Sequence, residues 1–554
     1  MRGKQVLMES LVAHGVGFIF GNPGTTESPI IDSLAAYPQL RYIAALHEGV
    51  ALGAASYYAQ ATGKTGVVNL HVAPGLGNAL GMLYGAMKAN SPLVVTAGQQ
   101  DTRFRLRDPL LGHDLVAMAS PLTKWSVQAE RAHELPLLLH RAFKIAHDPP
   151  SGPVFVALPI DVLEQETEVE SVPVGPLYRS GLPDPAGIEK AAALLLERER
   201  PVIVIGDGVA RSRAEDEILA LAEALGAPVW REGVHMHASL PSKHANFRLS
   251  LPFDAASIRK ALDEADAVLL IGGPFFEEVW FSPGAPFPSQ AVLIHVEESP
   301  ALLAYKQGVH LGLVGQIKAV LHGLHVAVEG GASARFREAA ARRNQALRAL
   351  KDEEFARQRS RAEKHWDRLP ISLSRLMAEI EAALPENAVV VDESITASLD
   401  LERTLTVPGP GSYYGARGGG IGQALPGALG VKLAHPDRPV VTLCGDGSAM
   451  YSIQALWTAA QHDLAILFVI LNNGEYRILK HNIDTYRQRF GVRPDRTYPY
   501  MDLRPPDLGF VDLAKGLGVQ GVRVTAPDDL RPALTRALSA RQPYLLDVLV
   551  EKKA

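Results

Sequence analysis

The sequence predicts an α/β protein built from three doubly wound parallel-sheet domains. Short apolar runs alternate with amphipathic helical patterns along nearly the whole chain, which is typical of parallel strands covered by helices on both faces. The chain of 554 residues is also too long for a single hydrophobic core. Because the apolar runs fall into three clusters, we expect three α/β domains of similar size.

The expected strands are continuous apolar runs rather than alternating ones, as is typical of strands buried on both faces of a sheet. In the N-terminal cluster they are GVGFIFG, TGVVNLHV and PLVVTAG. In the middle cluster they are PVIVIGDG, APVWRE, AVLLIGG and QAVLIHVE. In the C-terminal cluster they are AVVVDES, RPVVTLCGDG, LAILFVILNN and PYLLDVLV.

Two stretches of different composition separate the three clusters. Residues 164–185 are rich in proline, glycine and charge and are predicted to form a surface linker. Residues 330–370 are dense in alanine, arginine and glutamate, and their mixed charges favour a solvated helix over a binding tail. The predicted domains are therefore residues 1–165, 185–325 and 366–554.

Composition limits the classes of function. The net charge of −5 argues against a general nucleic-acid-binding protein, and no apolar run is long enough to suggest a membrane span. The single cysteine, Cys444, excludes an internal disulfide and a cysteine-rich metal site. The first residues follow helical spacing interrupted by Glu9 and His14, unlike a signal peptide. We expect a cytoplasmic protein that binds neither nucleic acid nor membrane.

The most informative segment is GDGS followed by an Asn-Asn pair. A predicted buried strand, 440–444, leads into the GDGS turn, a helix is expected from about Ser448 to His462, and a second strand ends at Asn473. In a βαβ unit both strands end at the same edge of the sheet, which is where open α/β sheets bind ligands. The pattern therefore predicts that Asp446 and Asn473 lie together.

These two strand ends offer oxygen ligands for a metal ion. Asp446 supplies a carboxylate, Asn473 an amide oxygen and Glu475 a backbone carbonyl, and three oxygens suit Mg²⁺, which completes its shell with phosphate and water. Gly445 and Gly447 let the backbone approach a phosphate at the start of the expected helix. A diphosphate bridged by Mg²⁺ is predicted; the simpler alternative for each turn alone is a loop without metal.

GDGS followed by NN resembles the signature of thiamine-diphosphate enzymes, and in particular the decarboxylases and carboligases of 2-keto acids. Other phosphate-binding motifs are absent or incomplete. The sequence GxxxxGK[ST] does not occur, and in PVIVIGDGVARS Arg211 stands where the third glycine of a dinucleotide-binding fingerprint belongs. The chain is similar to benzoylformate decarboxylases along nearly its whole length. The similar segments are FGNPGTTESP, NLHVAPGLGNALG, SPLVVTAGQQ, PLTKWS, GSYYGARGGGIGQALP and GDGSAMYSIQALWTAAQ.

This resemblance implies catalytic roles for three residues of the N-terminal domain. Glu48 would be the glutamate that activates the cofactor; its neighbours are apolar, and its simpler interpretation is a glutamate favoured by a helix dipole. His71 would transfer protons, although a histidine at the end of the strand TGVVNLHV is, by itself, more simply a structural residue. Thr25 would replace a serine that binds the substrate carboxylate.

The resemblance also assigns cofactor-binding residues. Ile421 would bend the cofactor, Gly419 would accept a hydrogen bond from its aminopyrimidine ring, and Thr396 and Ser448 would contact the diphosphate. Glycines 418–420 have an independent reason to be there, because side chains would obstruct a ring packed on the backbone. The expected cofactor-binding residues are Gly419, Ile421, Thr396, Gly447, Ser448 and Asn473.

The chain departs from the benzoylformate decarboxylases in its expected substrate pocket. Their second catalytic histidine is matched by Val279, which cannot carry a proton; His113 is a candidate substitute, with a surface loop histidine as the alternative. Ile478 and Asn482 replace a smaller and an aromatic residue. Leu110-Leu111 stands where acetolactate synthases have Phe-Gln.

We therefore expect a thiamine-diphosphate- and Mg²⁺-dependent, non-oxidative 2-keto acid decarboxylase with carboligase activity. One alternative is an acetolactate-synthase-type carboligase, which Leu110-Leu111 and the lack of glycine-rich flavin features disfavour. The other is a non-catalytic cofactor-binding protein, which the intact Glu48, Asp446 and Asn473 disfavour. The resemblance also implies a homodimer or homotetramer, with Glu48 of one chain facing Asp446 of another at the subunit interface. The sequence does not identify the 2-keto acid.

Overall fold

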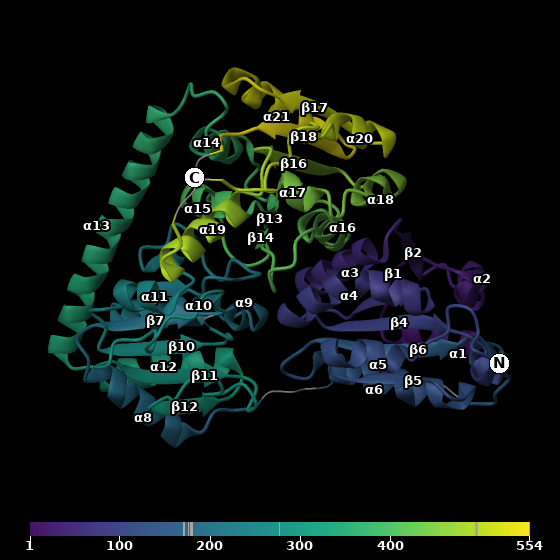
Figure 1. Cartoon of the computed structure of the whole chain (residues 1–554). Helices are drawn as coiled ribbons and strands as arrows, with labels where there is room; N and C mark the ends of the chain where they lie inside the picture. Colours follow the sequence, from purple (N-terminus) through teal and green to yellow (C-terminus); the bar gives the residue numbers. More distant parts are fainter. Residues whose placement is uncertain (170–171, 176, 178–180, 276, 494–496, 553–554) are drawn as a thin grey trace.

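The computed structural model describes residues 1–554 except 170–171, 176, 178–180, 276, 494–496 and 553–554. Its strands form three six-stranded sheets, in which neighbouring strands run parallel. Figure 1 shows the three sheets as separate layers with helices packed on their faces. The predicted α/β class with three doubly wound parallel sheets is confirmed.

The N-terminal sheet has the strand order β2-β1-β3-β4-β6-β5. Its strands are β1 (Phe18–Gly21), β2 (Arg41–Ala44), β3 (Gly66–Leu70), β4 (Leu93–Gln99), β5 (Ser126–Gln128) and β6 (Pro153–Pro159). Its helices are α1 (Gly3–Ala13), α2 (Ser28–Ser33), α3 (Glu48–Thr62), α4 (Val72–Lys88), α5 (Leu115–Ala119), α6 (Leu135–His147) and α7 (Ile160–Glu164).

The middle sheet has the order β12-β11-β10-β7-β8-β9. Its strands are β7 (Pro201–Ile205), β8 (Val229–Arg231), β9 (Phe247–Ser250), β10 (Ala267–Ile271), β11 (Val292–Glu297) and β12 (Leu311–Val314). Its helices are α8 (Pro185–Leu196), α9 (Gly208–Arg211), α10 (Glu215–Leu225), α11 (Ala255–Ala261) and α12 (Ile317–Gly331).

The C-terminal sheet has the order β14-β13-β15-β16-β18-β17. Its strands are β13 (Val389–Glu393), β14 (Tyr413–Tyr414), β15 (Val440–Gly445), β16 (Ile466–Asn472), β17 (Gln520–Val524) and β18 (Tyr544–Leu549). Its helices are α14 (Leu373–Ala383), α15 (Ser398–Thr404), α16 (Ala424–Ala434), α17 (Asp446–Ala449), α18 (Ala455–Gln461), α19 (Arg477–Phe490), α20 (Phe510–Gly516) and α21 (Leu530–Ser539).

Every strand predicted from a continuous apolar run is present. The strands without such a prediction are β2, β5, β6, β9, β12, β14 and β17, and all of them except β6 lie at sheet edges. Edge strands are short and exposed along one side, so they do not require a continuous apolar run. The sequence pattern therefore finds the interior of each sheet better than its borders.

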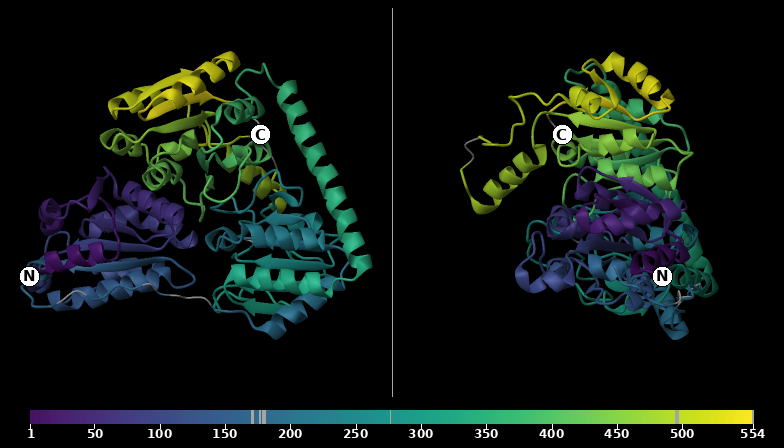
Figure 2. Two further views of the ribbon diagram at one scale, coloured as in Figure 1. Left: turned by 180° about the vertical axis from the view of Figure 1, so that it is seen from behind. Right: turned by 90° about the vertical axis from the view of Figure 1, so that its right-hand side faces the viewer.

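The predicted solvated helix at the second boundary is confirmed as α13 (Ala334–Lys364). It runs along the outside of the molecule from the middle domain to the C-terminal domain (Figure 2). Glu354 on this helix pairs with Arg248, and Arg361 pairs with Asp400 at 3.4 Å, so the helix is tied to both domains. The predicted linker, 164–185, lies partly outside the described residues.

The N-terminal and C-terminal domains share one hydrophobic core. Buried side chains of α3 and α16 belong to the same cluster, and the Tyr57 hydroxyl of α3 donates to the Gly415 carbonyl at 2.6 Å. The two domains therefore pack against each other through α3 and α16. This packing holds α3 in place beyond its first residue, Glu48. Among the helices of the described residues, none is both long and apolar enough to cross a membrane.

The prediction of one helix from about Ser448 to His462 is wrong. The chain forms the short helix α17, turns, and then forms α18. In the turn, the Tyr451 amide donates to the Ser448 carbonyl at 3.1 Å and the Ser452 amide to the Ala449 carbonyl at 3.2 Å, so the chain tightens into i to i+3 bonds. The break allows Tyr451 to pack against Gly422 of the loop before α16.

Candidate active site

The carboxyl ends of β15 and β16 meet at Asp446, as the βαβ pattern predicts. Asp446 directly follows β15 and is buried. Its Oδ1 accepts from the Gly447 amide at 2.8 Å and its Oδ2 from the Gly474 amide at 2.7 Å. Burial raises the pKa of the Asp446 carboxyl to about 6, against the opposing effect of these two N–H donors. One carboxylate thus joins the ends of two adjacent strands.

Asn473 and Glu475 follow β16 beside this carboxylate. The Asn473 Oδ1 accepts from the Glu475 amide at 2.9 Å, and the Glu475 side chain is turned to Lys480, with Oε2 and Nζ 2.5 Å apart. Across the part of the chain that the structure describes, no three or more His, Cys, Asp or Glu side chains cluster as metal ligands. A cation here would therefore need amide and main-chain oxygens besides Asp446.

The loop before α16 carries Gly419 and Ile421. Gly419 adopts a φ of +73°, and a Cβ added there would have no neighbour within 4 Å, so its exposed face is free of side chains. The loop is held by Glu393, at the end of β13, whose carboxylate accepts from the Gly422 amide at 2.6 Å and the Ala424 amide at 2.7 Å. Burial raises the pKa of Glu393 to about 7. Sequence reasoning missed Glu393; its only signal is an acidic residue ending a buried strand.

Backbone strain marks two positions next to predicted site residues. Ile395, which precedes Thr396, has a φ of +52°, and Val72, which follows His71, has a φ of +38°. β-Branched residues rarely adopt such values, and such strain persists where the surrounding structure holds the chain in place. Thr396 itself is half-buried at the carboxyl end of β13.

Glu48 is the first residue of α3 and only 7% exposed. Its Oε2 accepts from Asn78 Nδ2 at 3.0 Å and its Oε1 from Asn22 Nδ2 at 3.5 Å. The helix start is capped by another residue, since His47 Nδ1 accepts from the Gly49 amide at 3.0 Å. Glu48 thus stands at a helix start, as its simpler interpretation requires, but its carboxylate binds side-chain amides of α4 and of the loop after β1.

His71 lies between the end of β3 and the start of α4, and its partner is Glu27. His71 Nδ1 is 2.7 Å from Glu27 Oε2, and the Glu27 side chain is fully buried in the one-turn helix Thr25–Glu27. The Gly24 amide also donates to Glu27, at 2.8 Å. A Cβ on Gly24 would lie 2.3 Å from the His71 ring, so this position requires glycine.

Glu27 is the functional candidate that sequence reasoning missed at this site. Its carboxylate favours the His71 tautomer with the proton on Nδ1, which leaves Nε2 as the nitrogen that accepts or donates a proton elsewhere. The sequence gives little indication of a role for Glu27, because an acidic residue in TTES after a proline-glycine turn is typical of the start of a helix. The bond to His71 spans 44 residues and is visible only in the fold.

Four other candidates, Thr25, His113, Leu110 and Val279, are exposed on this chain, whereas Ser448 is buried and Ile421 half-buried. Thr25 and His113 are exposed, and the His113 carbonyl accepts from Gln99 Nε2 at 2.8 Å. Val279 is 74% exposed and Leu110 84% exposed. Within the described residues, the hydrogen bonds of the His71 side chain go to Glu27 and Thr26, and none joins it to His113.

The chain matches known protein families along most of its length. A family model described as the N-terminal TPP binding domain of thiamine pyrophosphate enzymes matches residues 1–118, the central-domain model matches 188–324, and the C-terminal TPP binding domain model matches 396–548. The benzoylformate decarboxylase of Pseudomonas aeruginosa is 35% identical over 98% of this chain and 97% of its own length. The chain belongs to the thiamine pyrophosphate enzymes.

Other thiamine pyrophosphate enzymes are similar along the whole chain. A putative acetolactate synthase large subunit of Mycobacterium tuberculosis is 30% identical, over 99% of both chains. The 4-hydroxybenzoylformate decarboxylase of Rhodococcus jostii RHA1 has a TM-score of 0.86 with 31% identity, and the benzoylformate decarboxylase of Polynucleobacter necessarius has 0.87 with 27%; each match covers 100% of this chain and 99% of the other. The protein is thus a thiamine-diphosphate-dependent enzyme of the 2-keto acid decarboxylase and carboligase class.

Proposed function

We propose that this thiamine pyrophosphate enzyme is a Mg²⁺-dependent, non-oxidative decarboxylase of a 2-keto acid, with carboligation as a second activity. The observation that carries the proposal is the His71–Glu27 pair. Release of an aldehyde requires a proton at the carbon that loses carbon dioxide, whereas a carboligase must keep protons away from that carbon. A histidine oriented by a buried carboxylate favours the first outcome.

The oxygen ligands at the ends of β15 and β16 fit a hard cation. Asp446 is a buried carboxylate whose hydrogen bonds come from backbone amides, and burial raises its pKa to about 6. A cation would relieve the cost of that buried charge. Asp446, the Asn473 amide and the Glu475 carbonyl would hold Mg²⁺, with Gly447 and Ser448 beside the diphosphate.

The remaining roles are proposed for residues of the same site. When bound, thiamine diphosphate accepts the electron pair that departing carbon dioxide leaves behind. Glu48 would exchange a proton with the aminopyrimidine ring, which Gly419 and Ile421 would hold, while Thr396 would contact the diphosphate. Thr25 would hydrogen-bond the substrate carboxylate, and His71 would deliver the product's proton. His113, which is exposed, would substitute for the second catalytic histidine.

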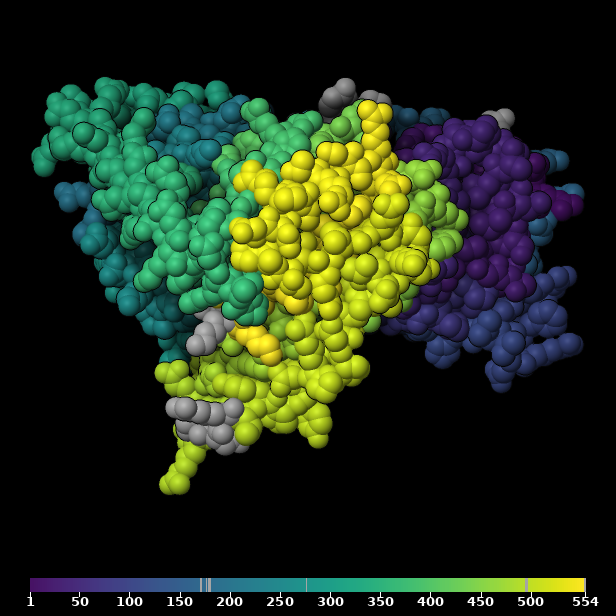
Figure 3. Space-filling view, turned by 90° about the horizontal axis from the view of Figure 1, so that it is seen from above, coloured from purple at the N-terminus to yellow at the C-terminus, as the bar shows by residue number. Residues whose placement is uncertain are grey.

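We also propose that two chains complete each site, in a homodimer or homotetramer that works in the cytoplasm. Support comes from apolar side chains that one chain leaves uncovered. Leu110 is 84% exposed and Phe490 62% exposed. α19 buries none of its residues, and Figure 2 shows it projecting from the body of the molecule. Its segment, yellow-green in Figure 3, stands out from the rest of the surface. Such uncovered apolar surface is typical of a protein interface.

A screen of aromatic, branched and short 2-keto acids tests the proposed function. We expect aldehyde release that depends on both thiamine diphosphate and Mg²⁺, with acyloin formed more slowly. Conversion of pyruvate to acetolactate without aldehyde, together with flavin absorbance of the purified protein, would favour the acetolactate-synthase alternative. Cofactor binding without turnover of any substrate would favour a non-catalytic protein.

Replacing Glu27 with glutamine should lower kcat/KM about tenfold or more, because His71 loses the charged acceptor that orients it. The substitution preserves the shape of the side chain. His71→Ala should cost at least as much. If the two residues act as one unit, the double variant should be no worse than His71→Ala alone. Losses that multiply in the double variant would contradict the proposed pairing.

A further inference from the structure

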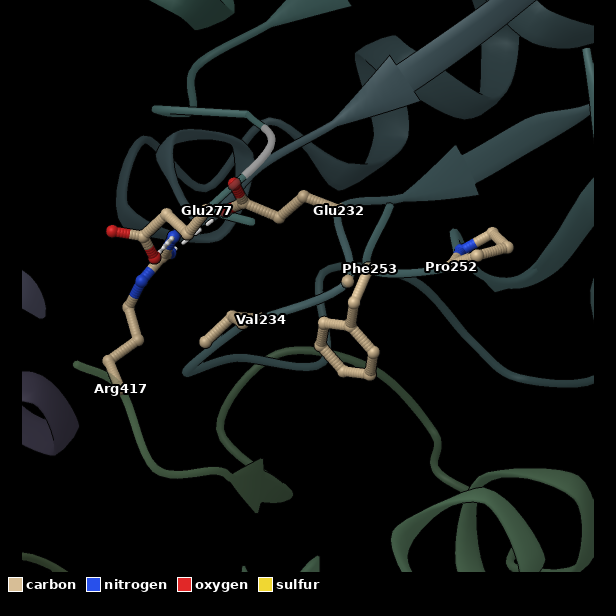
Figure 4. A pocket seen from close by; sticks show the side chains of 7 residues that line it. Glu232, Val234, Pro252, Phe253, Glu277 and Arg417 are labelled. Carbon is tan, nitrogen blue, oxygen red and sulfur yellow. Dashed lines mark hydrogen bonds and ion pairs between the residues drawn. The ribbon is translucent and has the colours of Figure 1, made fainter. Parts of the chain in front are cut away.

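The loop that carries Gly419 and Ile421 is joined to the middle domain by a buried arginine. Arg417 is 2% exposed, and its Nη1 lies 2.8 Å from Glu232 Oε1 and its Nη2 3.2 Å from Glu277 Oε2 (Figure 4). Nη1 also pairs with Asp207. These carboxylates follow β7, β8 and β10, so a side chain of the C-terminal domain is inserted at the carboxyl edge of the middle sheet.

The cluster is strongly charged and largely buried. Burial opposes the charge of Asp207, but the Arg417 guanidinium and nearby basic groups hold the pKa of its carboxyl well below its usual range. Burial raises the pKa of Glu232, which shares the same guanidinium. Asp207 also accepts from the Met236 and His237 amides, each at 3.0 Å. The position of Arg417 is therefore set by carboxylates that are themselves fixed to the backbone of the middle domain.

The loop receives its other support on either side of this arginine. The Gly415 amide donates to the Met236 carbonyl at 2.7 Å, again in the middle domain. Gln423 Nε2 donates to the Arg417 carbonyl at 2.8 Å and to the Gly420 carbonyl at 2.6 Å. The residues between, glycines 418–420, have few steric restraints of their own. An anchor directly before them limits the conformations that the loop can adopt.

We propose that Arg417 is a positioning residue that makes cofactor affinity depend on the middle domain. It holds the loop so that Gly419 and Ile421 are already placed for the aminopyrimidine ring, and less conformational freedom is lost on binding. This inference rests on the proposed cofactor-binding role of the loop. A guanidinium suits the task because its planar fork contacts several carboxylates in one fixed orientation, which a lysine ammonium cannot do.

The test compares Arg417→Lys with Arg231→Lys. Both retain the charge, and Arg231 is a matched control because it is a buried arginine that pairs with Glu402 across the same two domains. In Arg417→Lys we expect the Kd for thiamine diphosphate, measured with saturating Mg²⁺, to rise about tenfold or more, since charge-assisted bonds of the fork are lost. Amide hydrogen exchange of residues 415–424 should be faster in the cofactor-free variant. Arg231→Lys should change neither quantity more than about threefold.

A second variant covers the case in which Arg417→Lys does not fold. Glu277 lines a small pocket and is the most exposed of the three carboxylates, so Glu277→Gln leaves both buried pairs of Arg417 intact. It should weaken cofactor binding about threefold and accelerate amide hydrogen exchange in the same loop.

Unchanged affinity and exchange in the folded Arg417 or Glu277 variant overturn the inference, as does an equal effect in Arg231→Lys. If the wild-type protein does not bind thiamine diphosphate, the proposed function fails, while the exchange data still decide whether Arg417 holds the loop.

Discussion

Glu48→Gln should lower kcat at least about a hundredfold, because an amide cannot exchange the proton that activates the cofactor. Glutamine has nearly the same shape and can still accept from Asn78, which donates to Glu48 at 3.0 Å. We therefore expect the free energy of unfolding to change little. The measurement is kcat for the best 2-keto acid at saturating thiamine diphosphate and Mg²⁺.

The control for this substitution is Glu197→Gln, at a 69% exposed side chain of the middle domain. It removes the same charge far from the proposed chemistry and should leave kcat unchanged. Full turnover by Glu48→Gln would refute the assignment of Glu48 as the activating carboxyl. Loss of turnover together with loss of cofactor binding would instead indicate that Glu48 is needed for affinity.

Asp446→Asn should weaken binding of thiamine diphosphate with Mg²⁺ about a hundredfold, because the anionic ligand of the cation is lost. The amide oxygen can still accept a hydrogen bond from Gly447 or Gly474, so the strand ends keep part of their connection. Calorimetric titration of the cofactor-free protein measures the affinity. A thermal melt should show a rise in Tm on adding cofactor and Mg²⁺ to the wild type and almost none in the variant.

The pH dependence of that stabilisation follows from the pKa of Asp446. Burial raises it from 3.8 to about 6, so in the protein without cation the contribution of this group to stability is fully present below 3.8 and is lost as the pH rises through about 6. A cation binds the ionised form and reverses the loss. The rise in Tm caused by Mg²⁺ and cofactor should thus be larger at about pH 7.5 than at about pH 5. A rise independent of pH, or one retained by Asp446→Asn, would argue against Asp446 as a metal ligand.

The site residues at strand ends were accessible from the sequence because parallel strands end at a common edge. That rule places Asp446 beside the end of β16 without knowledge of any long-range contact, and the structure joins the two through the Gly474 amide. The single helix predicted after GDGS is wrong: the chain breaks there, and the break brings Tyr451 against Gly422, a contact between distant segments that the local pattern does not contain. Edge strands such as β2 and β17 were missed because burial on one side leaves a weaker apolar pattern.

The partners of the candidate catalytic and cofactor-binding residues were not accessible in this way. Glu27 meets His71 across 44 residues, and Arg417 meets Asp207 across 210. A single glutamate or arginine has the same local pattern whether it is buried or solvated. Its protonation and its partner depend on which distant groups exclude water around it.

The sequence by itself determined the α/β class, the interior strands of three sheets and the resemblance to thiamine-diphosphate enzymes, because periodicity and motif spacing are local properties of the chain. The tertiary structure alone decided that His71 is paired with Glu27, that Glu393 holds the loop before α16, and that Arg417 ties this loop to the middle domain. The physical reason is that hydrogen bonds and ion pairs gain their specificity from burial, and burial exists only once the three domains have packed together.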